Sequence, residues 1–190
     1  MIQRLLVWSI DETAGFDSVW ARLDETRLVA DGHAVGLRPA PFSTSYTVET
    51  SEDFVTASVH VETRWDGGSA VLDLRRADAG GWTVNGESRP DLEGAVDCDL
   101  AGCPLTNTMP VLRHRLLDEA GDLELLMAFI EVPSLRVVPD RQRYTHVRSA
   151  VDGRPAAVRY RSDGFESVIT FDPEGFVLDY PQLGRRVRAS

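Results

Sequence analysis

The sequence has 190 residues, of which 43% are hydrophobic and 26% are charged, and its formal net charge is −10. This composition is typical of a globular protein, and the length suits a single domain covering residues 1–190. An acidic surface repels phosphate groups, so the charge argues against binding to nucleic acid and to anionic lipid surfaces. All 20 Lys and Arg residues are arginine, which excludes a lysine Schiff base and a P-loop lysine.

The N-terminal region carries no targeting signal that we recognise. The apolar run at residues 5–10 is too short for the core of a signal peptide, and Asp11 and Glu12 end it. No stretch approaches the roughly 20 apolar residues that a membrane-spanning helix needs. We therefore expect a cytoplasmic protein without a transmembrane segment, with both cysteines reduced.

Turn-forming pairs separate short alternating runs along the chain. Residues 17–30 suit a short helix or a strand. Residues 54–62 alternate with a period of two, as do residues 70–74 and 176–180, which predicts half-buried antiparallel strands. Four Asp-Gly pairs supply the positive φ angles of tight hairpins, at Asp31-Gly32, Asp66-Gly67, Asp152-Gly153 and Asp163-Gly164.

Helical signals are weak and few. Residues 123–130 fit either a helix or a strand that is apolar on both faces, and the nearby Pro133 with its β-rich surroundings favours the strand. One short helix or 3₁₀ turn is expected after Pro104, with Thr106 or Asn107 as its cap.

These elements predict a mostly β protein, in which a curved antiparallel sheet forms a barrel or half-barrel, with a sandwich as the alternative and few short helices. Residues 46–86 and 158–180 share a weak pattern of strand, turn, Phe-led strand and turn. A pseudo-repeat of two β-meanders would explain that pattern.

The chemical candidates cluster around residues 97–114. Cys98 and Cys103 are separated by four residues, which is not the spacing of a zinc site, so we expect buried thiols and no metal. A nucleophilic cysteine would need an activating environment that Cys103, placed before a proline, lacks. No glycine-rich phosphate loop is present, so no cofactor is expected.

Two aspartates in this region, Asp97 and Asp99, keep open the hypothesis that the protein is an enzyme. Asp97 and Asp99 lie on the same face if their segment is extended. Together with Arg113 and Gln142 they could form the site of an enzyme that acts on a small polar metabolite, marked by a strongly perturbed carboxylate pKa. No catalytic residue can be assigned from the sequence alone. A protein-interaction domain is a third possibility, and it would carry an exposed apolar patch.

The most distinctive stretch has the pattern Asp-x-Asp-Leu, followed by Pro-x-Thr-Asn-Thr-x-Pro and a basic residue. The positions are Asp97, Asp99, Leu100, Pro104, Thr106, Asn107, Thr108, Pro110 and Arg113. Further short matches follow the same order at residues 81–86, 133–135, 142–145 and 178–181. From about Leu28 to the end, the sequence resembles the bacterial putative glycolipid-binding family, first defined as a domain of unknown function. In that pattern Cys103 is usually Ser or Thr, which argues against thiol chemistry as a shared function.

This resemblance implies a half-barrel like that of periplasmic lipid carriers, with an apolar cavity for a glycolipid or another amphipathic small molecule and no catalytic activity. Hydrogen bonds to the ligand would come from six residues, Thr106, Asn107, Thr108, Arg113, Gln142 and Thr145. The walls of the cavity would come from Trp82, Phe129, Tyr144, Phe171, Phe176 and Tyr180. The Thr-Asn-Thr residues suit an alternative role equally well, because such side chains commonly satisfy backbone groups of a buried loop.

Overall fold

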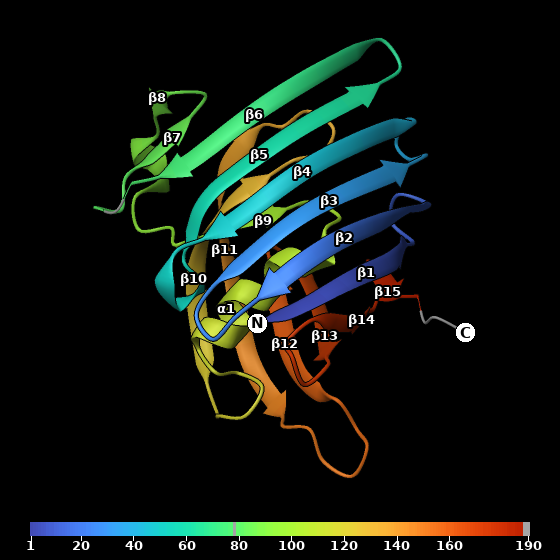
Figure 1. Ribbon diagram of the computed structural model, residues 1–190, viewed down its shortest axis with the longest axis vertical. Helices are drawn as coiled ribbons and strands as arrows, with labels where there is room; N and C mark the ends of the chain where they lie inside the picture. The colour runs from blue at the N-terminus through green and yellow to red at the C-terminus, as the bar shows by residue number, and fades with distance from the viewer. Residues whose placement is uncertain (78, 188–190) are drawn as a thin grey trace.

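The computed structural model describes residues 1–77 and 79–187 (Figure 1). Its strands form one 15-stranded, strongly curved sheet that stays open, in the order β8-β7-β6-β5-β4-β3-β2-β1-β15-β14-β13-β12-β11-β10-β9. The predicted β class with a curved sheet is thus confirmed. In the described residues no helix is long and apolar enough to cross a membrane.

The first half of the sheet is an antiparallel meander. Its strands are β1 (Ile2–Ile10), β2 (Gly15–Leu23), β3 (Leu28–Gly36), β4 (Phe42–Thr50), β5 (Thr56–Trp65), β6 (Gly68–Arg76), β7 (Trp82–Val84) and β8 (Glu87–Ser88). Two 3₁₀ turns accompany it, η1 (Glu52–Phe54) and η2 (Pro90–Leu92).

The second half contains the remaining strands and the α-helix. They are β9 (Asp97–Leu100), η3 (Pro104–Asn107), α1 (Thr108–Arg113), β10 (Asp122–Ile130), β11 (Val137–Arg148), β12 (Ala156–Ser162), β13 (Phe165–Phe171), β14 (Val177–Tyr180) and β15 (Gly184–Arg186). Strands β9 and β10 pair in parallel, whereas the other named pairs are antiparallel.

The two halves meet where the first and last strands pair. Trp8 of β1 faces Arg186 of β15, and Ile10 faces Gly184. The first and last strands, β1 and β15, therefore lie in the middle of the sheet, while β8 and β9 form its two edges. The segments with the weak repeat pattern fall in opposite halves, residues 46–86 on β4 to β7 and residues 158–180 on β12 to β14.

The alternation of apolar and polar residues predicts which side chains are buried in β5, except where the register of strand pairing shifts. In β5, Val59 and Val61 are buried and His60 is exposed, as predicted. Thr56 is buried rather than exposed, because the pairing with β4 skips one residue of β5 between Thr56 and Ser58, and this irregularity turns the Thr56 side chain inward.

One predicted turn is wrong. Asp31 and Gly32 lie inside β3, whereas the other three Asp-Gly pairs lie in turns. Gly32 faces Tyr46 of β4, and a Cβ atom at Gly32 would lie 2.1 Å from the Tyr46 ring. The glycine is needed for this close approach of an aromatic ring, not for a positive φ angle.

The ambiguous and helical segments agree with the predictions except at the cap. Residues 123–130 fall in strand β10, and η3 with α1 follows Pro104. Asn107 occupies the position before α1, but its side chain makes no capping hydrogen bond. The side chains of Thr106 and Asn107 bond elsewhere, as described below.

The interior of the curve is filled by η3 and α1 (Figure 1). Every residue from 103 to 111 is buried. Met109 packs into the apolar cluster of the first half, which includes Trp8 and Val59, and Val111 packs into the cluster of the second half, which includes Phe171. This segment therefore fastens the two halves together from the concave side.

Candidate functional site

The Thr-Asn-Thr segment follows the turn that leads from the end of β9 into the interior of the curved sheet. Strand β9 pairs in parallel with β10, with Asp97 opposite Met127 and Leu100 opposite Ile130. Gly102 has a φ of +75° and turns the chain toward Pro104. The turn brings Thr106 back beside Asp99, although the two residues are on different elements.

Hydrogen bonds fix the first two residues of the segment. The Thr106 hydroxyl lies 2.9 Å from Asp99 Oδ1 and 3.0 Å from the Cys103 carbonyl oxygen. Asn107 donates to the Pro104 carbonyl oxygen at 3.4 Å, and its Oδ1 lies 3.0 Å from the Tyr144 hydroxyl. These contacts match the alternative reading, in which the segment organises a buried loop.

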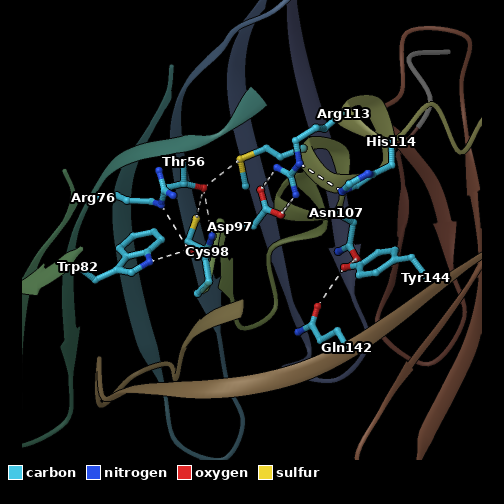
Figure 2. Close-up of polar contacts among 12 residues, drawn as sticks. Thr56, Arg76, Trp82, Asp97, Cys98, Asn107, Arg113, His114, Gln142 and Tyr144 are labelled. Carbon is cyan, nitrogen blue, oxygen red and sulfur yellow. Dashed lines mark hydrogen bonds and ion pairs between the residues drawn. The ribbon is translucent and has the colours of Figure 1, made fainter. Parts of the chain in front are cut away.

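Gln142 of β11 links two carboxylates. Its Nε2 donates to Asp99 Oδ2 at 2.6 Å and to Asp140 Oδ2 at 2.9 Å. Its Oε1 lies 3.1 Å from the Tyr144 hydroxyl, which donates its single proton either there or to Asn107 (Figure 2). Asp140, Gln142 and Tyr144 alternate along β11, so the period of two aims all three to the same side.

Burial controls the ionisation of this network. It raises the pKa of Asp99, while the hydrogen bonds from Gln142 and Thr106 oppose that rise. Burial also raises the pKa of Tyr144 and of Tyr160 well above the usual tyrosine value, so both hydroxyls remain protonated donors.

A cavity of about 390 Å³, here called the Asp99 cavity, opens beside the network. Its polar lining includes Glu12, Asp99, Asn107, Asp140, Ser162, Asp163 and Gln182. Its aromatic lining is Phe129, Tyr160, Phe165 and Tyr180, and the remainder is Leu100, Ala101, Gly102, Cys103 and Leu183. Among the described residues, none that lines it is an arginine or a histidine. The expectation of an apolar cavity is therefore corrected to a mixed one with four carboxyl groups.

Aromatic rings form one wall of this cavity. The ring centroid of Tyr160 lies 6.0 Å from that of Phe165 and 5.8 Å from that of Tyr180, and the Phe165 and Tyr180 centroids are 6.2 Å apart. Tyr160 also contacts Tyr144 edge to face at 5.4 Å. Three neighbouring strands, β12 to β14, supply the aromatic wall. Of the four carboxyl groups, those of Asp99 and Asp140 come from β9 and β11, and those of Glu12 and Asp163 come from turns.

Arg113 lies away from the Asp99 cavity. Its guanidinium binds both carboxyl oxygens of Asp97, and its Nε donates to His114 at 3.4 Å (Figure 2). The Asp97 side chain is 1% exposed and that of Arg113 is 12% exposed. Asp97 and Asp99 thus share a face of β9 but bond to different partners, and the convergence expected of an enzyme site is found only for Asp99 and Gln142.

Trp82 and the two cysteines are structural in their contacts. The Trp82 indole N–H donates to the Ala95 carbonyl oxygen at 2.9 Å within the core, on the side of Figure 2 away from Tyr144. Both cysteines are free and buried, and burial raises the pKa of Cys98 to about 12. In the part of the chain that the structure describes, no group of His, Cys, Asp and Glu residues could hold a metal ion.

Comparison with known proteins identifies the family. The family model described as putative glycolipid-binding matches residues 5–186. The chain belongs to this family. A crystal structure of a DUF1089 family protein from Pseudomonas aeruginosa matches with a TM-score of 0.74 and 27% identity, covering 90% of this chain and 92% of that one. A comparison with curated proteins found no match.

The residues of the putative glycolipid-binding signature therefore fall into two groups in the structure. Some line the Asp99 cavity, and others form a buried ion pair. Asp99, Leu100 and Asn107 line the Asp99 cavity, whereas Asp97 and Arg113 pair with each other. Of the other predicted ligand-binding residues, Tyr180 lines the cavity. Thr106, Gln142 and Tyr144 are not part of its lining, but they form hydrogen bonds with Asp99 or Asn107, which are. The Thr108 hydroxyl is buried and has no hydrogen-bond partner among the described residues.

Sequence reasoning missed several residues of this cavity in the putative glycolipid-binding chain. Asp140, Tyr160, Ser162 and Phe165 were not singled out, although all four line it. A period-of-two signal was present, because Asp140 precedes Gln142 and Tyr144 on one face of β11. Following that face to the adjacent strand would have led to Tyr160, which pairs directly with Tyr144.

Proposed function

We propose that the protein binds an amphipathic small molecule, a glycolipid or a related lipid, with the polar head group in the Asp99 cavity and without catalysing a reaction. The observation that carries this proposal is the cavity wall itself, where Tyr160, Phe165 and Tyr180 face a hydrogen-bonded set of carboxylates. A volume of about 390 Å³ falls within the range of small-molecule sites.

The lining favours a head group rich in hydroxyl groups. Asp99, Asp140 and Ser162 offer oxygen acceptors, and the aromatic wall offers apolar faces against which a sugar ring can pack. Four carboxyl groups without a basic residue in the described lining disfavour an anionic head group, because like charges repel strongly in a partly buried site. Arg113 does not belong to the proposed site, since Asp97 already occupies its guanidinium.

Replacing Phe165 with alanine should weaken the binding of octyl glucoside about tenfold, because an aromatic contact in such a site is worth roughly 1 kcal/mol beyond the apolar area it covers. Phe165 lines the cavity and is only half-buried, so its removal should leave the fold intact. Isothermal titration calorimetry with octyl glucoside, below its micelle concentration, measures the effect. Octyl phosphate should bind more weakly than octyl glucoside to the wild-type protein.

Trp20 provides the matched control. It is 50% exposed on β2 and does not line the Asp99 cavity, so Trp20→Ala removes an aromatic side chain of comparable size elsewhere. Its affinity for octyl glucoside should equal that of the wild type. Equal losses in the two variants would indicate nonspecific adsorption, and the absence of binding to any neutral, cationic or anionic octyl compound would reject the proposal.

A further inference from the structure

Two more concave features continue from the Asp99 cavity. The Thr13 recess is small, about 20 Å³, and the Phe16 groove is open, with a volume of about 530 Å³. The recess is lined by Ile10, Thr13, Phe16, Ala34, Val35, Phe42, Thr44, Tyr46, Leu100, Ala101, Gly102, Cys103 and Val132. The groove is lined by Ala14, Gly15, Phe16, Val35, Gly36, Leu37, Pro41, Phe42, Ser43, Arg64 and Trp65.

Shared residues place the three features in a row. Residues 100–103 line both the Asp99 cavity and the Thr13 recess. Phe16, Val35 and Phe42 line both the recess and the Phe16 groove. The turn between β1 and β2 runs along all three, because Glu12 lines the cavity, Thr13 the recess, and the next residues the groove.

The chemistry of the lining changes along this row. The Asp99 cavity holds four carboxyl groups, whereas the groove is apolar apart from Ser43 and Arg64. Phe16, Val35 and Leu37 at the groove are 54%, 51% and 65% exposed. Three large apolar side chains exposed side by side on a surface rich in charge indicate a site that something apolar covers.

We propose that the Phe16 groove holds the aliphatic chain of the ligand whose head group lies in the Asp99 cavity, and that the chain crosses between them at the Thr13 recess. This inference rests on the proposed function. The continuity of the lining from carboxylates to apolar side chains matches the two ends of one amphipathic molecule, and this is why we assign the groove to a lipid tail.

The Thr13 recess is the narrow point of the path. Its volume of about 20 Å³ is close to the space of one water molecule, so side chains must shift when an alkyl chain passes. Gly102 lies across the recess from Thr13, since a Cβ atom at Gly102 would be 4.0 Å from the Thr13 methyl group, an ordinary contact distance. The backbone of the turn is fixed, because the Thr13 carbonyl accepts hydrogen bonds from the amides of Leu37 and Arg38 at 2.8 and 3.0 Å. Side-chain rotation, rather than movement of the turn, opens the path.

The test is a chain-length series of alkyl glucosides, from methyl to decyl, titrated calorimetrically below their micelle concentrations. In the wild type, affinity should rise about two- to fourfold per methylene group beyond the shortest chains, because each buried methylene contributes up to about 0.8 kcal/mol. Leu37→Ser should reduce the gain for the longest chains. Thr13→Phe, at a residue that lines the recess but neither the Asp99 cavity nor the groove, should narrow the path and abolish the gain at shorter length. Both variants should bind methyl glucoside as the wild type does.

Val71→Ser is the matched control, because Val71 is 56% exposed on β6 and lines none of the three features. It should retain the full chain-length dependence. An affinity that is flat with chain length in the wild type, while methyl glucoside still binds, would reject the tail path and leave the proposed function standing. If the wild type forms a dimer in sedimentation experiments that Leu37→Ser dissociates, the groove is an interface between two copies and the tail path is rejected.

Discussion

The wild-type protein should lose about 3 kcal/mol of stability between pH 5 and pH 8 through the carboxyl group of Asp17, at 1.36 kcal/mol per pH unit. Asp17 is fully buried, and the Tyr46 hydroxyl lies 2.9 Å from each of its oxygens. Burial raises its pKa from 3.8 to about 7. Over that range the folded protein keeps the proton while the unfolded chain releases it, so rising pH favours unfolding.

The sign follows from the direction of the pKa change. The stabilising effect of the protonated Asp17 carboxyl is fully present below pH 3.8 and is lost as the pH rises through about 7. Burial also raises the pKa of Asp99 and lowers that of His114, which add pH dependences of opposite sign. Only a comparison with Asp17→Asn isolates the contribution of Asp17.

Urea unfolding of the wild type and Asp17→Asn at pH 5 and pH 8 provides the measurement. The difference in the free energy of unfolding between the two proteins should change by about 3 kcal/mol across this interval, since asparagine does not titrate. The neighbouring thiol should not interfere, because burial raises the pKa of Cys103 far above this range. A difference that stays constant from pH 5 to pH 8 would contradict the buried, protonated state of Asp17.

Arg113→Met should destabilise the protein by about 3–5 kcal/mol at pH 7, because it leaves the Asp97 carboxylate buried without its cation. The pair joins the end of α1 to β9, and so links the segment in the interior to the edge of the sheet. The measurement is the free energy of unfolding from denaturant titration. The double variant Asp97→Leu/Arg113→Met should recover much of the loss, because two apolar side chains replace the ion pair.

The exposed pair Arg143–Asp122 is the internal comparison for this prediction. Its side chains are 49% and 47% exposed, so Arg143→Met should leave the free energy of unfolding nearly unchanged. A similar small cost for Arg113→Met would show that the Asp97–Arg113 pair behaves like a surface ion pair and would contradict the structural role assigned to it.

The sequence was sufficient to predict the sheet but not all of its pairings. Alternation identified strands such as residues 70–74, because one face of each strand is buried and the other is not. The pair Asp31-Gly32 was wrongly predicted to form a turn. An Asp-Gly pair looks the same in the sequence whether its glycine forms a hairpin turn or makes room for an aromatic ring, here that of Tyr46. The inward position of Thr56 depends on the extra residue of β5 between Thr56 and Ser58, and the alternation of residues 54–62 does not reveal where that irregularity lies.

The candidate site was also predicted only in part, because contacts between distant segments decide which residues meet there. The family signature led to Asp99, Asn107 and Tyr180, which line the Asp99 cavity. It could not separate Arg113 from them, because the parallel pairing of β9 with β10 decides which acidic residue the guanidinium meets. Asp17 was also missed. It meets Tyr46 across β3, within the first half of the sheet, and the Cys103 thiol of the interior segment lies 3.2 Å from the same Tyr46 hydroxyl.

The pairing of β1 with β15 has a consequence for synthesis in the cell. Of the named strands, β1 emerges from the ribosome before the others, yet its neighbour β15 emerges after all of them. Until translation reaches residues 184–186, the edge of β1 from Trp8 to Ile10 has no partner on that side, and unpaired strand edges promote aggregation. Nascent chains stalled before β15 should therefore depend on chaperones more than the full-length protein does.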